Sequence, residues 1–123
     1  MHSVMIIDDS EADQFLAKYA IEEFDPDINV LQAYDGQEAL EVLKDLDTQP
    51  DVIFLDINMP RMNGHEFLEE YSKWDKCSVV IIMLTSSDQE IDKEKSTAYA
   101  SVVAYFTKPL DIDSLAKVLQ LRQ

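Results

Sequence analysis

The chain has 123 residues, enough for one domain with a hydrophobic core, and its apolar fraction of 46% and charged fraction of 28% are typical of soluble globular proteins. A net charge of −15 opposes binding to nucleic acid or anionic lipid and favours cations and basic protein surfaces. Cys77 is the only cysteine, so no intramolecular disulfide can form, and neither a signal-like segment nor a membrane-length apolar run is present. We therefore expect residues 1–123 to form a single cytoplasmic domain.

Short apolar runs alternate with amphipathic stretches along the chain, and this alternation predicts a parallel sheet with helices on both faces. The predicted strands are Ser3 to Asp8, Ile28 to Ala33, Asp51 to Asp56, Val79 to Leu84 and Val102 to Thr107. The first, third and fourth runs are nearly continuous in apolar residues, so we expect them to be the central strands.

Helices are predicted from apolar residues spaced three and four apart. The first has a capping pair, Ser10 and Asp13, and a row expected to face the sheet: Ala12, Phe15, Leu16, Tyr19 and Ala20. The second begins after a cap from Asp35 and Glu38, and its row is Ala39, Leu40, Leu43 and Leu46. The third row is Phe67, Leu68, Tyr71 and Trp74, and the last, after Asp111, is Ile112, Leu115, Val118 and Leu119.

The fourth predicted helix, Ser87 to Ala100, has fewer apolar residues for packing than the others. Elements with few buried apolar contacts open at lower free energy, so we expect this helix to be the least firmly held. It is either part of a switch or simply a marginal helix, and the periodicity alone does not separate these two interpretations.

Polar residues stand at the carboxyl ends of four predicted strands, where open parallel sheets bind ligands. The first strand ends in Asp8 and is followed by Asp9, Asp56 ends the third, Thr85 follows the fourth and Lys108 follows the fifth. An aspartate pair after a strand is, by itself, more often a helix cap beside a solvated charge. Three carboxylates in one concavity require an offsetting charge, and Mg2+, which prefers hard oxygen ligands, would supply it together with the lysine.

The segments around these residues resemble the receiver domain of bacterial two-component response regulators, from Ser3 to Leu121. The matching segments are Ile7-Asp8-Asp9-Ser10, Leu55-Asp56-Ile57-Asn58-Met59-Pro60 with Met62-Asn63-Gly64, Leu84-Thr85-Ser86, and Tyr105-Phe106-Thr107-Lys108-Pro109-Leu110. The resemblance implies an α/β, flavodoxin-like (βα)5 three-layer sandwich with a parallel five-stranded sheet in the order 2-1-3-4-5. The resemblance extends over nearly the whole chain, so we expect residues 1–123 to form a single receiver domain.

The resemblance implies that Asp56 is the phosphoacceptor, which takes a phosphoryl group from a sensor histidine kinase, a histidine phosphotransfer protein or a small phosphodonor. Mg2+ would be held by Asp8, Asp9 and Asp56 together with the backbone carbonyl of Asn58. No other cofactor is implied.

Thr85 and Lys108 would bind oxygens of the phosphoryl group, the first through its hydroxyl and the second as a point charge. In proteins of this family, movement of the threonine lets an aromatic residue, here Tyr105, turn inward. Thr85 and Tyr105 would thus form the switch that changes the surface built from the fourth helix, the fifth strand and the fifth helix.

The function expected from the resemblance is that of a stand-alone response regulator, whose phosphorylation switches its binding to an unknown downstream protein. It would not be an enzyme for external substrates, because similar phosphatases carry an acid where this chain has Asn58. A phosphorelay intermediate and a phosphorylation-independent receiver-like module stay open, as does phosphorylation-dependent homodimerisation. A flavin carrier is disfavoured, since Asp8 and Asp9 would repel the cofactor phosphate.

Overall fold

The computed structural model describes residues 3–46, 49–56, 64–74, 80–85 and 102–107, and within these ranges it follows the predicted alternation. The strands are β1 (Ser3–Ile7), β2 (Asn29–Ala33), β3 (Val52–Asp56), β4 (Val80–Thr85) and β5 (Val102–Thr107). The helices are α1 (Glu11–Phe24), α2 (Gly36–Lys44) and α3 (Gly64–Tyr71). The helices predicted from Ser87 to Ala100 and after Asp111 lie outside the described residues.

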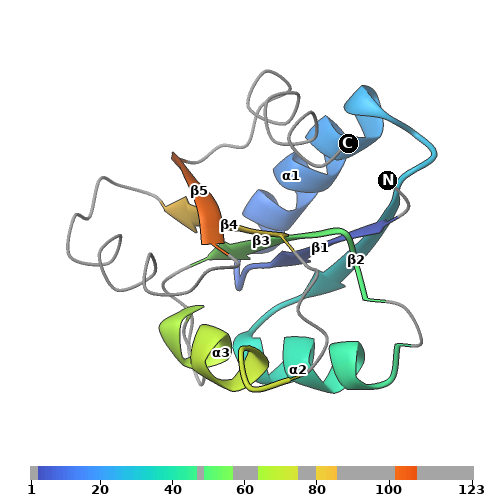
Figure 1. Cartoon of the computed structure of the whole chain (residues 1–123). Coiled ribbons are helices and arrows are strands. Elements are labelled where there is room, and N and C mark those ends of the chain that lie inside the picture. The colour runs from blue at the N-terminus through green and yellow to red at the C-terminus, as the bar shows by residue number, and fades with distance from the viewer. Residues whose placement is uncertain (1–2, 47–48, 57–63, 75–79, 86–101, 108–123) are drawn as a thin grey trace.

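All strand pairs are parallel, and the order in the sheet is β2-β1-β3-β4-β5 (Figure 1). The predicted order is therefore confirmed, and so is the central place of the three most apolar strands. Val52 to Asp56 are all buried, as are Val4 to Ile7, because strands inside such a sheet are covered on both faces.

Side chains that alternate along the strands build two hydrophobic clusters, one on each face of the sheet. Figure 1 shows α1 on one face and α2 with α3 on the other. The cluster on the α1 face contains Val4, Ile6, Ala17, Ala20, Ile21, Ile28, Val52, Phe54, Ile82 and Leu84. The cluster on the α2 and α3 face contains Met5, Ile7, Ala33, Ala39, Leu43, Ile53, Leu55, Phe67, Leu68, Tyr71, Ile81 and Met83. The described elements thus form three layers, as predicted.

The prediction of which side of α1 faces the sheet was largely wrong. Phe15, Leu16 and Tyr19 are 67%, 47% and 56% exposed, and only Ala20 of the predicted row is buried. The buried row is instead Gln14, Ala17, Ala20 and Ile21. Two rows of side chains with helical spacing run along this helix. The row that packs against the sheet contains Ala17 and Ala20, whose small side chains allow a close approach to the strands. The larger side chains are left on the outer side.

Both predicted helix caps are present in the structure. The Ser10 hydroxyl accepts a hydrogen bond from the amide of Asp13 at 3.3 Å, and an Asp35 carboxylate oxygen accepts one from the amide of Glu38 at 2.8 Å. These acceptors satisfy amides that have no partner inside the first turn of a helix. The caps fix where α1 and α2 begin, immediately after the carboxyl ends of β1 and β2.

The end of α3 lies near the amino ends of the strands, at the opposite edge of the sheet from their carboxyl ends. The hydroxyl of Tyr71 donates to Gln49 at 2.8 Å, and Gln49 lies just before β3 begins. Trp74 follows the helix and packs against the Tyr71 ring, with the ring centroids 5.1 Å apart. This places the tryptophan near the amino ends of the strands.

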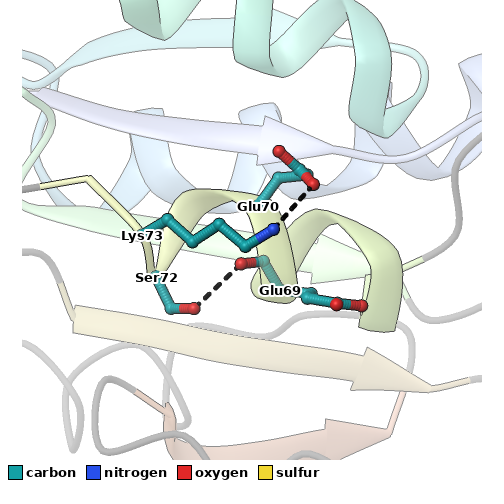
Figure 2. A network of polar contacts seen from close by, with 4 residues as sticks. All are labelled: Glu69, Glu70, Ser72 and Lys73. Atoms are coloured by element: carbon teal, nitrogen blue, oxygen red, sulfur yellow. Dashed lines mark hydrogen bonds and ion pairs between the residues drawn. The ribbon is translucent and has the colours of Figure 1, made fainter.

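Figure 2 shows the polar contacts at the exposed surface of this helix end. The Lys73 ammonium group lies 3.3 Å from the Glu70 carboxylate, and the Ser72 hydroxyl donates to the backbone carbonyl of Glu69 at 3.0 Å. A solvent-exposed ion pair of this kind contributes about 0–1 kcal/mol. The Lys73–Glu70 ion pair therefore contributes little to the stability of the fold.

Among the described helices, none is both long enough and apolar enough to span a membrane.

Candidate functional site

Three aspartates meet at the carboxyl end of the sheet. Asp56 is the last residue of β3, and Asp8 and Asp9 follow β1 directly. The two strands are neighbours, with Ile7 opposite Leu55, so the residues next along each strand lie side by side. Each aspartate offers one carboxylate oxygen that is within 4.8 Å of the other two. The structure therefore brings together the three carboxylates that the sequence pattern had placed at one edge.

The cluster is partly enclosed and partly open to solvent. Asp8 and Asp56 are only 1% and 5% exposed, whereas Asp9 is an exposed residue. At an effective dielectric constant of about 20, two unit negative charges about 5 Å apart repel by about 3 kcal/mol. A hard divalent cation would relieve this repulsion, and carboxylate oxygens are the ligands that such cations prefer. The donor set thus fits a Mg2+-type ion.

Backbone groups hold Asp8 in place on both of its sides. Its amide donates to the carbonyl of Ala33 at 3.0 Å and so extends the pairing of β1 with β2 by one residue. One of its carboxylate oxygens accepts a hydrogen bond from the amide of Ser10 at 3.0 Å. A carboxylate bound in this way has a fixed direction, which prepares the site for an ion before the ion arrives.

The structure adds Gln14, a residue that the sequence pattern did not single out. Its side chain is 1% exposed, and its amide nitrogen lies 3.1 Å from the carbonyl oxygen of Ile6, 3.1 Å from that of Asp8 and 2.7 Å from that of Ala33. A glutamine is normally assigned to the solvent side of a helix. The signal that could have found it is its place one helical turn after the Ser10 cap, in line with Ala17 and Ile21.

Two other predicted residues are placed by their strands. Thr85 ends β4 and follows Leu84, which lies opposite Asp56 in the register of β3 and β4. Tyr105 lies in β5 opposite Met83, and Thr85 itself lies opposite Thr107. Thr85 is therefore at the same sheet edge as the aspartates, and Tyr105 is on the adjacent strand. Lys108 and Asn58 lie outside the described residues.

Comparison with known proteins identifies the family. Residues 4–120 match the response regulator receiver domain, so the chain belongs to this family of two-component signal transduction proteins. It is 35% identical over 121 residues to the chemotaxis protein CheY of Halobacterium salinarum, and the match covers 94% of this chain and 95% of that protein. The solved structure of the chemotaxis response regulator CheY4 of Vibrio cholerae has a TM-score of 0.83 and 28% identity, and the match covers 100% of this chain and 99% of that one.

The same domain also occurs within larger proteins. The chain is 33% identical over 118 residues to the sensor histidine kinase CheAY of Helicobacter pylori, and the match covers 95% of this chain but only 14% of that protein. Receiver domains bind Mg2+ at an acidic cluster of the kind formed here by Asp8, Asp9 and Asp56. Those of chemotaxis-like regulators interact with histidine kinases and with downstream effectors.

Proposed function

We propose that this receiver domain is phosphorylated on Asp56 and that Mg2+, held by Asp8 and Asp9, supports the reaction. The observation that carries the proposal is the meeting of three carboxylates within 4.8 Å at the carboxyl end of neighbouring strands. Asp56 suits the role of acceptor because it is 5% exposed and is the last residue of a buried strand. Its side chain therefore has little freedom to lose when a donor approaches.

In the proposed reaction, a carboxylate oxygen of Asp56 forms a bond to phosphorus while the bond from phosphorus to the donor breaks. The donor is a phosphohistidine nitrogen or the acyl oxygen of a small phosphodonor, and it leaves with the bonding electron pair. Asp8, Asp9, Asp56 and the Asn58 carbonyl would hold the metal, and bound Mg2+ would neutralise charge on the transferring oxygens. The product is an acyl phosphate on Asp56.

Thr85 and Lys108 complete the proposed site by binding oxygens of the phosphoryl group. The position of Thr85 at the end of β4, next to the strand that carries Asp56, supports this role. We assign Tyr105 to the switch, and its place on β5, which pairs with β4, supports that assignment. The phosphoryl group adds about −1.5 to −2 charge and thereby shifts an existing conformational equilibrium.

We propose a histidine kinase or histidine phosphotransfer protein as the donor, a downstream protein as the receiver of the signal, and the cytoplasm as the place where they meet. The net charge of −15 supports basic protein surfaces as partners and disfavours nucleic acid. Turnover of external substrates is not part of this function, since a domain that stores a phosphoryl group on itself reacts once for each signal.

The test is intact-protein mass spectrometry after incubation with acetyl phosphate, with Mg2+ and with excess EDTA. The expected result is a gain of one phosphoryl group that needs Mg2+ and is lost in Asp56→Asn. Asp45→Asn is the matched control, because Asp45 undergoes the same chemical change at an exposed position after α2. The fluorescence of Trp74 is a poor readout of Mg2+ binding at the aspartates. Trp74 lies near the amino ends of the strands, whereas the aspartates lie at the carboxyl ends, so a bound ion would not quench it directly.

A folded wild-type protein that gains no mass with Mg2+ would overturn the proposal and favour a phosphorylation-independent interaction module. Equal labelling of Asp56→Asn and wild type would show that the protein is phosphorylated, but at a residue other than Asp56.

A further inference from the structure

We propose that Gln14 is a positioning residue that fixes the peptide group between Asp8 and Asp9, and with it the direction of both side chains. This role rests on the proposed function, because it concerns the aspartates that would hold Mg2+. Gln14 is the fourth residue of α1, it is 1% exposed, and it lies on the side of the helix that packs against the sheet. It is the buried polar residue that links α1 to the strands beneath it.

The direction of the Gln14 amide is determined by its neighbours. Its nitrogen lies 2.7–3.1 Å from the carbonyl oxygens of Ile6, Asp8 and Ala33. Backbone carbonyls only accept hydrogen bonds, so the opposite orientation would place the amide oxygen against three other acceptors. The two hydrogens of the NH2 group are thus shared among three carbonyls that belong to the ends of β1 and β2.

The bond to Asp8 links Gln14 to the candidate metal site. The carbonyl of Asp8 is part of the peptide group that joins Asp8 to Asp9, so a donor on this oxygen restricts rotation of that peptide. The amide of Ser10 holds the Asp8 carboxylate, and the carbonyl of Ala33 accepts from the Asp8 amide. Gln14 adds a contact at the carbonyl, so Asp8 is held at its amide, its carbonyl and its carboxylate.

A glutamine at this position has a cost in stability as well as a gain. Its side-chain oxygen is buried and has no hydrogen-bond partner among the described residues. Burial of an acceptor without a partner is unfavourable, and this cost offsets part of the stabilisation from the hydrogen bonds that the amide nitrogen donates to the three carbonyls. The amide is also neutral, so it orders the aspartates without a positive charge that would compete with a cation. This neutrality favours a role in the site.

The test measures Mg2+ affinity by isothermal titration calorimetry for the wild type, Gln14→Met and Ile21→Ala. Ile21 is 1% exposed on the same side of α1, so Ile21→Ala lowers stability without touching the aspartates. Loss of a group that orients metal ligands typically weakens metal affinity by about 10- to 100-fold, and we expect about tenfold for Gln14→Met. Ile21→Ala should bind Mg2+ like the wild type even where its melting temperature is lower.

A second measurement separates positioning from general damage. In phosphorylation by acetyl phosphate, the Mg2+ concentration for half-maximal rate should rise about tenfold in Gln14→Met, while the rate at saturating Mg2+ falls by less than about threefold. Gln14→Asn keeps the amide but shortens its reach, and should change affinity in the same direction. If circular dichroism shows that Gln14→Met is not folded, Gln14→Asn replaces it in both measurements.

The outcomes separate this role from the proposed function. Equal Mg2+ affinities for the wild type and the folded Gln14 variants would overturn the role of Gln14 alone. An equal loss of affinity in Ile21→Ala would overturn it as well, because the effect would then follow stability. A wild-type protein that binds Mg2+ but is not phosphorylated would overturn the proposed function and leave the calorimetric result for Gln14 standing. A wild-type protein that binds no Mg2+ would overturn both.

Discussion

Asp8, Asp9 and Asp56 present oxygens within 4.8 Å of one another, and two of these residues are almost fully buried. Even at the dielectric constant of water, each pair of charges at this distance repels by about 0.9 kcal/mol. Asp9 takes part in two such pairs, so the two repulsions together amount to at most about 2 kcal/mol in the metal-free protein. The positive end of α1, which begins two residues later, offsets about 0.3–1 kcal/mol of this repulsion. Repulsion is therefore the larger effect.

Asp9→Asn should raise the free energy of unfolding by about 1 kcal/mol in the absence of metal, because it removes this repulsion. It should also reduce the stabilisation that Mg2+ gives to the wild type, because one ligand is lost. Urea denaturation in EDTA and in excess Mg2+ measures both effects.

Asp27→Asn is the control for this substitution, since Asp27 is also exposed but lies between α1 and β2, at the other edge of the sheet. It should leave the response to Mg2+ unchanged. An Asp9→Asn protein that is less stable than wild type in EDTA would show that the three charges are not the dominant local interaction.

At the scale of elements, α1 shows how tertiary packing selects between two rows of side chains. Ile21 is 1% exposed and Ala17 is 3% exposed, whereas Phe15 and Tyr19 lie on the outer side and stack on each other with centroids 6.5 Å apart. Hydrophobicity alone favoured the aromatic row. The sheet takes the other row because small residues let the helix backbone come close to the strands.

Ile21→Ala should therefore destabilise the protein by about 2–5 kcal/mol, while Phe15→Ala should change stability by less than about 1 kcal/mol. Chemical denaturation of the two variants and wild type measures the difference. A larger loss for Phe15→Ala would mean that the aromatic row, as first predicted from the sequence, is the one that carries the packing of α1.

The caps of α1 and α2 differ in geometry, and their removal should differ in effect. Asp35→Ala removes the 2.8 Å hydrogen bond that the Asp35 carboxylate accepts from the amide of Glu38. Because Asp35 is only 6% exposed, this change should destabilise the protein by about 1–2 kcal/mol. Ser10→Ala removes a longer bond of 3.3 Å and should destabilise by about 0.5–1 kcal/mol.

Mg2+ affinity provides a further check on Ser10→Ala. The contact from Ser10 to Asp8 is made by its backbone amide, so this variant should bind Mg2+ nearly as well as wild type in calorimetry. A large loss would indicate that the hydroxyl acts on the aspartates directly.

At the scale of the whole molecule, a net charge of −15 on 123 residues means that the compact state is strained by self-repulsion. Salt screens these charges, and the Debye length falls from about 30 Å at 0.01 M to about 8 Å at 0.15 M ionic strength. The urea midpoint of the metal-free protein should therefore rise with NaCl over this range. A midpoint that stays constant or falls would show that local attractive pairs outweigh the overall repulsion.

Much of the fold was predictable because its signals are local or follow from strand direction. Buried parallel strands need long apolar runs, and every described strand lies on a predicted one with ends that differ by at most one residue. The caps by Ser10 and Asp35 were also readable, since a cap depends on residues three apart. The site aspartates could be grouped because the carboxyl ends of parallel strands share one edge.

The sequence by itself therefore determined the order of the elements, the central strands and the three aspartates of the site. The roles of Thr85, Lys108, Tyr105 and the Asn58 carbonyl remain predictions from the resemblance. Only the tertiary structure decided which side of α1 is buried and that Gln14 reaches the Asp8 carbonyl. Both depend on how closely a helix packs against strands distant in sequence, because a buried glutamine is favourable only where three carbonyl oxygens converge on it.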